Sequence, residues 1–85
     1  MNLIFSDQAW QDYLYWQRTD KQKLKRINTL IQAIQRTPYE GIGKPERLKH
    51  ALAGYWSRRI DQEHRLVYKV TGQGDILLAQ LRYHY

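Results

Sequence analysis

Apolar residues recur with the spacing of an α-helix along two stretches in the first half of the chain. The first stretch runs from residue 7 to about residue 17 and places Trp10, Tyr13 and Leu14 on one face. The second begins at about residue 20, and its apolar positions keep a period near 3.6: Leu24, Ile27, Leu30, Ile31 and Ile34. The pattern predicts two helices, which form an antiparallel hairpin because only a few residues separate them.

Polar residues mark the ends of these helices. Ser6 is the predicted N-cap of the first helix, and Thr19 or Asp20 that of the second, because short polar side chains accept hydrogen bonds from first-turn amides. Thr37-Pro38 ends the second helix, since proline cannot continue it. Before the first helix, residues 2–6 are rich in β-forming side chains and predict a short strand.

The second half of the chain has the pattern of a sheet. Residues 38–45 are dense in turn-forming residues and predict an exposed loop. The extended segments expected after this loop are Leu48–Leu52, Tyr55–Ile60, His64–Thr71 and Ile76–Tyr85. The fold class is therefore α+β: a β-α-α unit followed by antiparallel strands, with both helices packed on one face of the sheet.

The alternation of side chains along these strands predicts a basic face. A three-residue turn at residues 61–63 places Arg59 directly across from Arg65. In the last strand, one side carries Leu77, Ala79, Leu81 and Tyr83. This set should cover the helices, which leaves Arg82 and His84 on the open face with the other two arginines. An anionic ligand would explain such a cluster, and the alternative is arginines that are separately solvated or paired with Glu46 and Glu63. A register slip of one residue would scatter it.

Length and composition narrow the class of protein. The 85 residues leave room for one domain, residues 1–85, and a hydrophobic content of 42% argues against disorder. There is no cysteine, so neither disulfides nor thiolate metal sites are expected. No apolar run reaches the roughly 20 residues of a membrane helix, and the N-terminus lacks the pattern of a signal peptide. A cytoplasmic protein without membrane contact is expected.

The charge balance indicates an anionic partner. Fourteen Lys and Arg residues against eight Asp and Glu residues give a formal net charge of +6. A basic domain of this size usually meets phosphates, anionic lipid or an acidic protein.

Four chemistries can be compared with this sequence. The three histidines lack metal-ligand spacing. Gly41-Ile-Gly43-Lys44 has the wrong spacing for a nucleotide-binding P-loop, and Ser57 lies among arginines rather than beside a base. Metal-free phosphoryl transfer needs a base, an acid and cations around the phosphate. Glu46, His84 and the arginines would supply these groups, provided that the loop brings Glu46 to the open face.

The chain resembles the YoeB (Txe) toxins of the RelE superfamily along essentially its whole length. The resemblance rests on the following runs: Trp56-Ser-Arg-Arg-Ile60, Glu63-His-Arg-Leu-Val-Tyr68, Arg82-Tyr-His-Tyr85, Asp12-Tyr-Leu-Tyr-Trp16, Arg36-Thr-Pro38, Gly43-Lys-Pro-Glu46 and Leu48-Lys-His50. It implies the small RelE-like fold and a bacterial type II toxin that cuts messenger RNA in the decoding site of the ribosome, inhibiting translation. It also implies a YefM-like antitoxin, a possible homodimer, and no metal or other cofactor.

The resemblance further implies three catalytic roles. Glu46 corresponds to the general base that takes the proton of the ribose 2′-hydroxyl. Arg65 corresponds to the cation that stabilises the charged phosphorane. His84 corresponds to the general acid that protonates the departing 5′ oxygen.

Three further residues correspond to groups that bind the RNA. Lys49 and Arg59 are expected on the phosphate, and Tyr85 is the terminal aromatic residue expected to help orient it.

Two other functions share the charge and the aromatic residues. A basic module that binds RNA or the ribosome without cutting predicts that Glu46→Ala and His84→Ala leave function intact. A protein whose basic face only docks an acidic antitoxin segment predicts tight antitoxin binding and no growth arrest.

Overall fold

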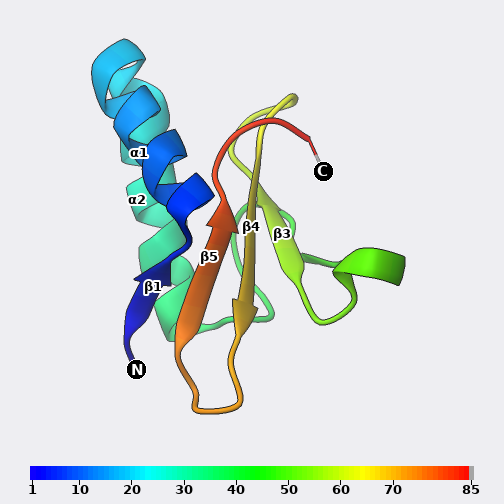
Figure 1. Ribbon diagram of the computed structural model, residues 1–85. Coiled ribbons are helices and arrows are strands. Elements are labelled where there is room, and N and C mark those ends of the chain that lie inside the picture. Colours follow the sequence, from blue (N-terminus) through cyan, green and yellow to red (C-terminus); the bar gives the residue numbers. More distant parts are fainter. Residues whose placement is uncertain (85) are drawn as a thin grey trace.

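A computed structural model describes residues 1–84 of the chain and shows one mixed sheet with two helices beside it (Figure 1). The strands lie in the order β1-β5-β4-β3-β2, with β1 parallel to β5 and the other neighbours antiparallel. The elements are β1 (Leu3–Phe5), α1 (Asp7–Thr19), α2 (Lys21–Arg36), β2 (Glu46–Arg47), the 3₁₀ helix η1 (His50–Leu52), β3 (Trp56–Arg59), β4 (Arg65–Val70) and β5 (Ile76–Gln80). This is the predicted α+β fold.

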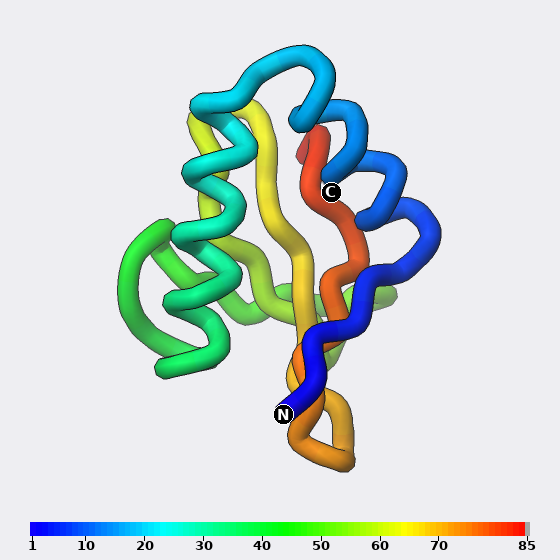
Figure 2. The backbone as a smooth tube through the Cα atoms, turned by 90° about the vertical axis from the view of Figure 1, so that its left-hand side faces the viewer, coloured from blue at the N-terminus to red at the C-terminus, as the bar shows by residue number. Residues whose placement is uncertain are grey.

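The two helices pack side by side on one face of the sheet, as predicted (Figure 2). Ser6 caps α1, its Oγ accepting a hydrogen bond from the Ala9 amide at 3.0 Å. Asp20 alone separates the helices and caps α2 by accepting from the amides of Gln22 and Lys23. Helix α1 runs to Thr19, two residues beyond the expected end, because the tight connection needs no other linker. No helix among residues 1–84 is long and apolar enough to cross a membrane.

The core lies between the helices and the sheet. Side chains from α2, β4, β5 and the segment after β5 are fully buried there: Ile27, Leu30, Ile34, Leu66, Tyr68, Ile76, Leu78 and Leu81. The core side of β4 is the predicted one, with Leu66 and Tyr68 inward and Arg65 on the opposite face.

A β-bulge in β5 corrects the predicted alternation of that strand. Val67 is paired with Gln80 and its neighbour Tyr68 with Leu78, so Ala79 is an extra residue. Leu78 and Leu81 can therefore both face the core, although they are three positions apart. The prediction was right for Leu81 and wrong for Leu77 and Ala79, because strict alternation assumes a ladder without a bulge.

Two of the predicted extended segments have a different structure. Leu48–Leu52 is not a strand, since pairing ends at Arg47 and residues 50–52 form η1, where His50 has a φ of 59°. The last strand ends at Gln80 instead of continuing to the end of the chain. The residues after it follow an irregular path, and Tyr83 has a φ of 67°, which is incompatible with a strand.

Candidate functional site

A pocket of about 370 Å³ opens on the face of the sheet opposite the core side chains Leu66 and Tyr68, and thus away from the helices. Residues from the loop before β2, from strands β2, β3 and β4, and from the C-terminal segment line it: Lys44, Pro45, Glu46, Ser57, Arg59, Arg65 and His84. Three cations, one carboxylate and one imidazole thus surround a small polar hollow. The pocket is suited to an anionic ligand, because nearby positive charges attract it at close range.

Strand pairing places the central residues of this pocket. Glu46 is paired with Ser57 across β2 and β3, and Arg59 is paired with Arg65 across β3 and β4. Ser57 and Arg59 share a face because they are two positions apart in one strand. The predicted register of Arg59 and Arg65 is confirmed.

Arg65 is buried, with an exposure of 8%, and its guanidinium is held by the turn that precedes it. Its Nη1 donates to the carbonyl oxygens of Asp61, Gln62 and His64 at 2.8, 3.2 and 3.1 Å. These bonds orient the guanidinium plane at the pocket wall, so Arg65 is a preorganised cation rather than a flexible surface charge.

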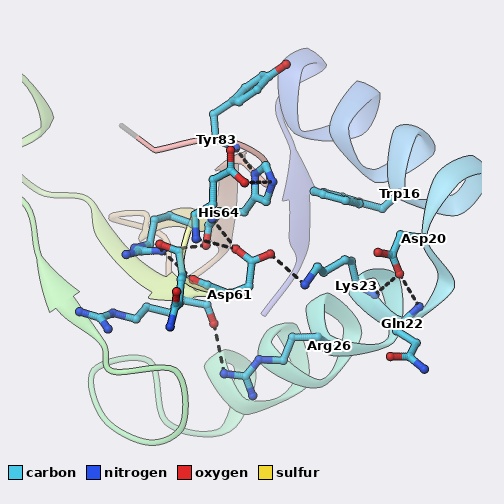
Figure 3. Close-up of polar contacts among 12 residues, drawn as sticks. Trp16, Asp20, Gln22, Lys23, Arg26, Asp61, His64 and Tyr83 are labelled. Carbon is cyan, nitrogen blue, oxygen red and sulfur yellow. Dashed lines mark hydrogen bonds and ion pairs between the residues drawn. The ribbon is translucent and has the colours of Figure 1, made fainter.

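The side chain of Asp61 stabilises the turn at residues 61–64 that holds Arg65 (Figure 3). Its Oδ1 accepts from the amides of Glu63 and His64, and its Oδ2 lies 2.9 Å from the Lys23 ammonium of α2. Burial opposes ionisation of Asp61, but the hydrogen bond and charge of Lys23 and the two amides outweigh it and lower the pKa of Asp61 to about 2. The same contact raises the pKa of Lys23.

Arg58, next to Arg59 in β3, points to the opposite face and anchors the loop that carries Glu46. The side chain is fully buried, and its two Nη atoms donate to the carbonyls of Ile42, Thr37 and Glu40 at 3.1, 2.6 and 2.9 Å. Its Nε donates to the hydroxyl of Tyr68, which itself donates to the Pro38 carbonyl at 2.5 Å. Burial raises the pKa of Tyr68, so this hydroxyl keeps its proton. Arg58 therefore organises residues 37–42.

Gly43 completes this anchor. Its carbonyl accepts from the Arg59 amide at 2.7 Å, and its φ is +84°. A Cβ at this position would lie 2.8 Å from Leu30 Cδ2 and 3.1 Å from Arg58 Cβ. Only glycine fits here without strain, and this close approach leads the chain directly into Lys44, Pro45 and Glu46 at the pocket.

The C-terminal segment reaches the pocket by crossing over the start of β4 (Figure 1). Helix α1 holds the start of this segment, because Asp12 Oδ2 accepts from the Leu81 amide at 2.9 Å and Trp16 Nε1 donates to the Leu81 carbonyl at 2.8 Å. The segment ends with His84 in the pocket wall.

The structure brings four of the six predicted site residues together: Glu46, Arg59, Arg65 and His84 line one pocket. Lys49 lies outside it, in a neighbouring hollow that Glu46 also lines. Tyr85 lies outside the described residues.

The expectation for Arg82 was wrong. Instead of joining the open face, its guanidinium lies 3.5 Å from the ring centre of Tyr15 in α1 and 4.5 Å from that of Tyr83. The bulge and the irregular segment after β5 change the alternation, so Arg82 turns to the helix side.

Sequence reasoning did not select Lys44 or Ser57 as site residues. Ser57 shares the strand face of Arg59, and this alternation could have identified it as a pocket residue. Lys44 has a φ of 53°, so its side-chain direction follows from a local turn and not from a regular pattern. Among residues 1–84, no group of three His, Asp or Glu side chains could hold a metal ion.

Comparison with known proteins gives a consistent result. The family of YoeB-like toxins of bacterial type II toxin–antitoxin systems matches residues 5–85. The chain is 61% identical to Toxin YoeB of Escherichia coli strain K12 and 52% identical to Toxin YoeB of Streptomyces coelicolor, in each case over the whole of both chains.

Solved structures agree with these sequence matches. A YoeB/ParE toxin from Agrobacterium tumefaciens has a TM-score of 0.97 at 51% identity, with full coverage of both chains. A chain of the heterotetrameric YoeB-YefM toxin–antitoxin complex from Staphylococcus aureus has a TM-score of 0.90 at 52% identity, covering 100% of this chain and 98% of that one. YafQ from E. coli, at 22% identity and a TM-score of 0.74, shares the fold.

Proposed function

This chain belongs to the YoeB-like toxins of bacterial type II toxin–antitoxin systems, and on that basis we propose that it is an endoribonuclease that cuts messenger RNA in the decoding site of the ribosome. The observation that supports the proposal most directly is the shared pocket of Glu46, Arg65 and His84. A carboxylate, a guanidinium and an imidazole around one hollow are the groups that cleavage of a phosphodiester by its own 2′-hydroxyl requires.

In the proposed reaction Glu46 takes the proton of the 2′-hydroxyl, and the freed oxygen attacks the adjacent phosphorus. Arg65, held by its three carbonyl partners, stabilises the negative charge that develops on the phosphorane, and Arg59 binds the phosphate beside it. His84, as the imidazolium, gives its proton to the 5′ oxygen as the P–O5′ bond breaks. The products are a 2′,3′-cyclic phosphate and a 5′-hydroxyl. Neither a metal nor another cofactor takes part in this scheme.

The ribosome is the second part of the proposal. The pocket is small and open, so a flexible RNA would rarely place its 2′-hydroxyl in line with the scissile bond. A message held in the decoding site is already ordered, and such ordering can lower a reaction barrier by several kcal/mol. Cleavage of free RNA as fast as that of ribosome-bound message would contradict this step. Because ribosomes and messages are its substrates, the proposed place of action is the bacterial cytoplasm.

The antitoxin is the third part. The related toxin of S. aureus has been solved as a YoeB-YefM complex and as a YoeB dimer. We propose that a YefM-like antitoxin binds this chain and covers the pocket, and that the toxin can form a homodimer. The pocket, with Lys44, Arg59 and Arg65, is electrostatically suited to an acidic antitoxin segment.

The direct test maps message 5′ ends on ribosomes that carry a defined message, with the wild-type chain and with Glu46→Gln and His84→Ala. Each variant is expected to slow cleavage by about 10²–10⁴-fold at unchanged cut sites, the usual contribution of a general acid or base. Glu40→Gln and His50→Asn are the matched controls, because both residues are exposed and lie outside the pocket. Unchanged rates in both site variants would favour the binding module, and an inert wild-type chain that still binds antitoxin would favour the docking protein.

A further inference from the structure

The residue assigned as general acid lies on a segment without regular secondary structure. Strand β5 ends at Gln80, and His84 is carried by the segment 81–84 outside the sheet ladder. Within it Tyr83 has a φ of 67°, a conformation that non-glycine residues adopt only when their surroundings hold them there. The position of His84 therefore depends on whatever holds Tyr83.

Both backbone groups of Tyr83 are bound by residues at the start of β4 and directly before it. The Tyr83 amide donates to His64 Nδ1 at 2.8 Å (Figure 3). The Tyr83 carbonyl accepts from the Arg65 amide at 3.0 Å. The second bond uses backbone only and is available to any residue at position 65. The first needs an acceptor at one place, the Nδ1 atom of His64.

The His64 ring is itself fixed. The imidazole makes a T-shaped contact with Trp16 of α1, with ring centres 4.9 Å apart and planes at 80°, and the His64 side chain is 12% exposed. Trp16 also donates a hydrogen bond to the Leu81 carbonyl, so this tryptophan contacts both His64 and the start of the C-terminal segment. Because Nδ1 accepts a hydrogen bond, its proton must be on Nε2, the nitrogen 3.7 Å from Glu63 Oε1.

We propose that His64 is a positioning residue for His84: its Nδ1 lone pair holds the Tyr83 amide and thereby sets where the His84 imidazole lies in the pocket. The inference rests on the proposed function for its effect on cleavage, because it assigns His64 no contact with the RNA.

Two substitutions at position 64 distinguish the effect of the hydrogen-bond acceptor from the effect of the size of the ring. His64→Asn places a side-chain oxygen close to where Nδ1 lies, whereas His64→Leu has a similar size and no acceptor. In single-turnover cleavage on saturating programmed ribosomes, His64→Leu is expected to be about 10- to 100-fold slower, as for a misplaced catalytic group, and His64→Asn to recover most of that loss. Ribosome affinity should change by less than about twofold in both, because His64 does not line the pocket.

A double-mutant cycle tests whether the effect passes through His84. In the His84→Ala background, His64→Leu should slow cleavage by less than about twofold, because the group that it positions is already gone. The same loss in both backgrounds, a fully active His64→Leu variant, or a folded but unrescued His64→Asn variant would each overturn the proposal.

An NMR measurement is independent of cleavage. The wild-type chain should show a scalar coupling across the hydrogen bond between the nitrogen of Tyr83 and Nδ1 of His64, and His64→Leu should change the nuclear Overhauser contacts of His84 with the other pocket residues. If the wild-type chain cuts no message, the proposed function fails, and this measurement alone decides the positioning role. Unchanged His84 contacts in His64→Leu would then refute it.

Discussion

Arg59 and Arg65 stand directly opposite each other across β3 and β4, on the pocket face of the sheet. Like charges in this arrangement destabilise a sheet, and a bound phosphate would reverse the effect by lying between them. Arg59→Gln should therefore raise the free energy of unfolding by about 0.2–1 kcal/mol while it slows cleavage of ribosome-bound message. Urea unfolding of the free toxin measures the first effect.

Salt provides the control for this prediction. The stability difference between wild type and Arg59→Gln should shrink as NaCl rises from about 0.05 to 1 M, because counterions screen the repulsion between the guanidinium groups. If Arg59→Gln is less stable than the wild type at low salt, repulsion between Arg59 and Arg65 does not destabilise the sheet.

Arg58 is expected to be essential for the shape of the pocket although it does not line it. Arg58→Met keeps the length of the side chain and removes the donors to three loop carbonyls. A hydrogen bond from a charged donor contributes about 1.5–3 kcal/mol, so the loss of these three part-buried bonds is expected to lower the unfolding free energy by roughly 3 kcal/mol or more. Thermal or urea unfolding measures it, and amide exchange should rise first in residues 37–46. A variant as stable as the wild type would show that water replaces these bonds.

Gly43 and Gly54 form a matched pair for testing close packing. Both have a positive φ, but a Cβ at Gly43 meets Leu30 and Arg58, whereas nothing lies within 4 Å of one at Gly54. Gly54→Ala should cost about 1 kcal/mol, for the backbone conformation alone. Gly43→Ala should cost about 1–3 kcal/mol more, because it also overpacks the core. Equal losses in urea unfolding would show that the loop moves to make room.

The lowered pKa of Asp61 predicts how the stability of the protein depends on pH in the acidic range. The folded state lowers the pKa of Asp61 from 3.8 to about 2, so this carboxylate stabilises the fold above pH 4, and the contribution is lost as the pH falls from about 4 to 2. Because the pair with Lys23 is partly exposed, the contribution is about 1–2 kcal/mol. Asp61→Asn should lower stability at pH 7 and flatten its dependence on pH over this range, as measured by urea unfolding. A variant with the same acid sensitivity as the wild type would assign the effect to other carboxyls.

Many features of the fold follow from local sequence. The helices, with caps at Ser6 and Asp20, are set by side-chain periodicity and by hydrogen bonds within a few residues. The pairing of Arg59 with Arg65 is equally local, because a short turn leaves one favourable register.

Tertiary structure decided the positions that depend on distant contacts. The bulge at Ala79 arises where β5 must satisfy both β4 and the helices, and it moves Arg82 onto Tyr15 and away from the face on which alternation placed it. Lys49 lies outside the pocket because strand β2 ends at Arg47, two residues before Lys49, and η1 begins at His50.

The site as a whole shows the same division. The sequence by itself determined which charged groups the chain carries. It also determined that Arg59 and Arg65 share one face of the sheet, because side chains alternate along a regular strand and a short turn joins the two strands. Only the tertiary structure decided that Glu46 and His84 reach the same pocket, because a loop anchored by Arg58 carries the first and a terminal segment held by α1 and His64 carries the second. Those anchors join residues 16 to 69 positions apart, and no local pattern reports contacts over such distances.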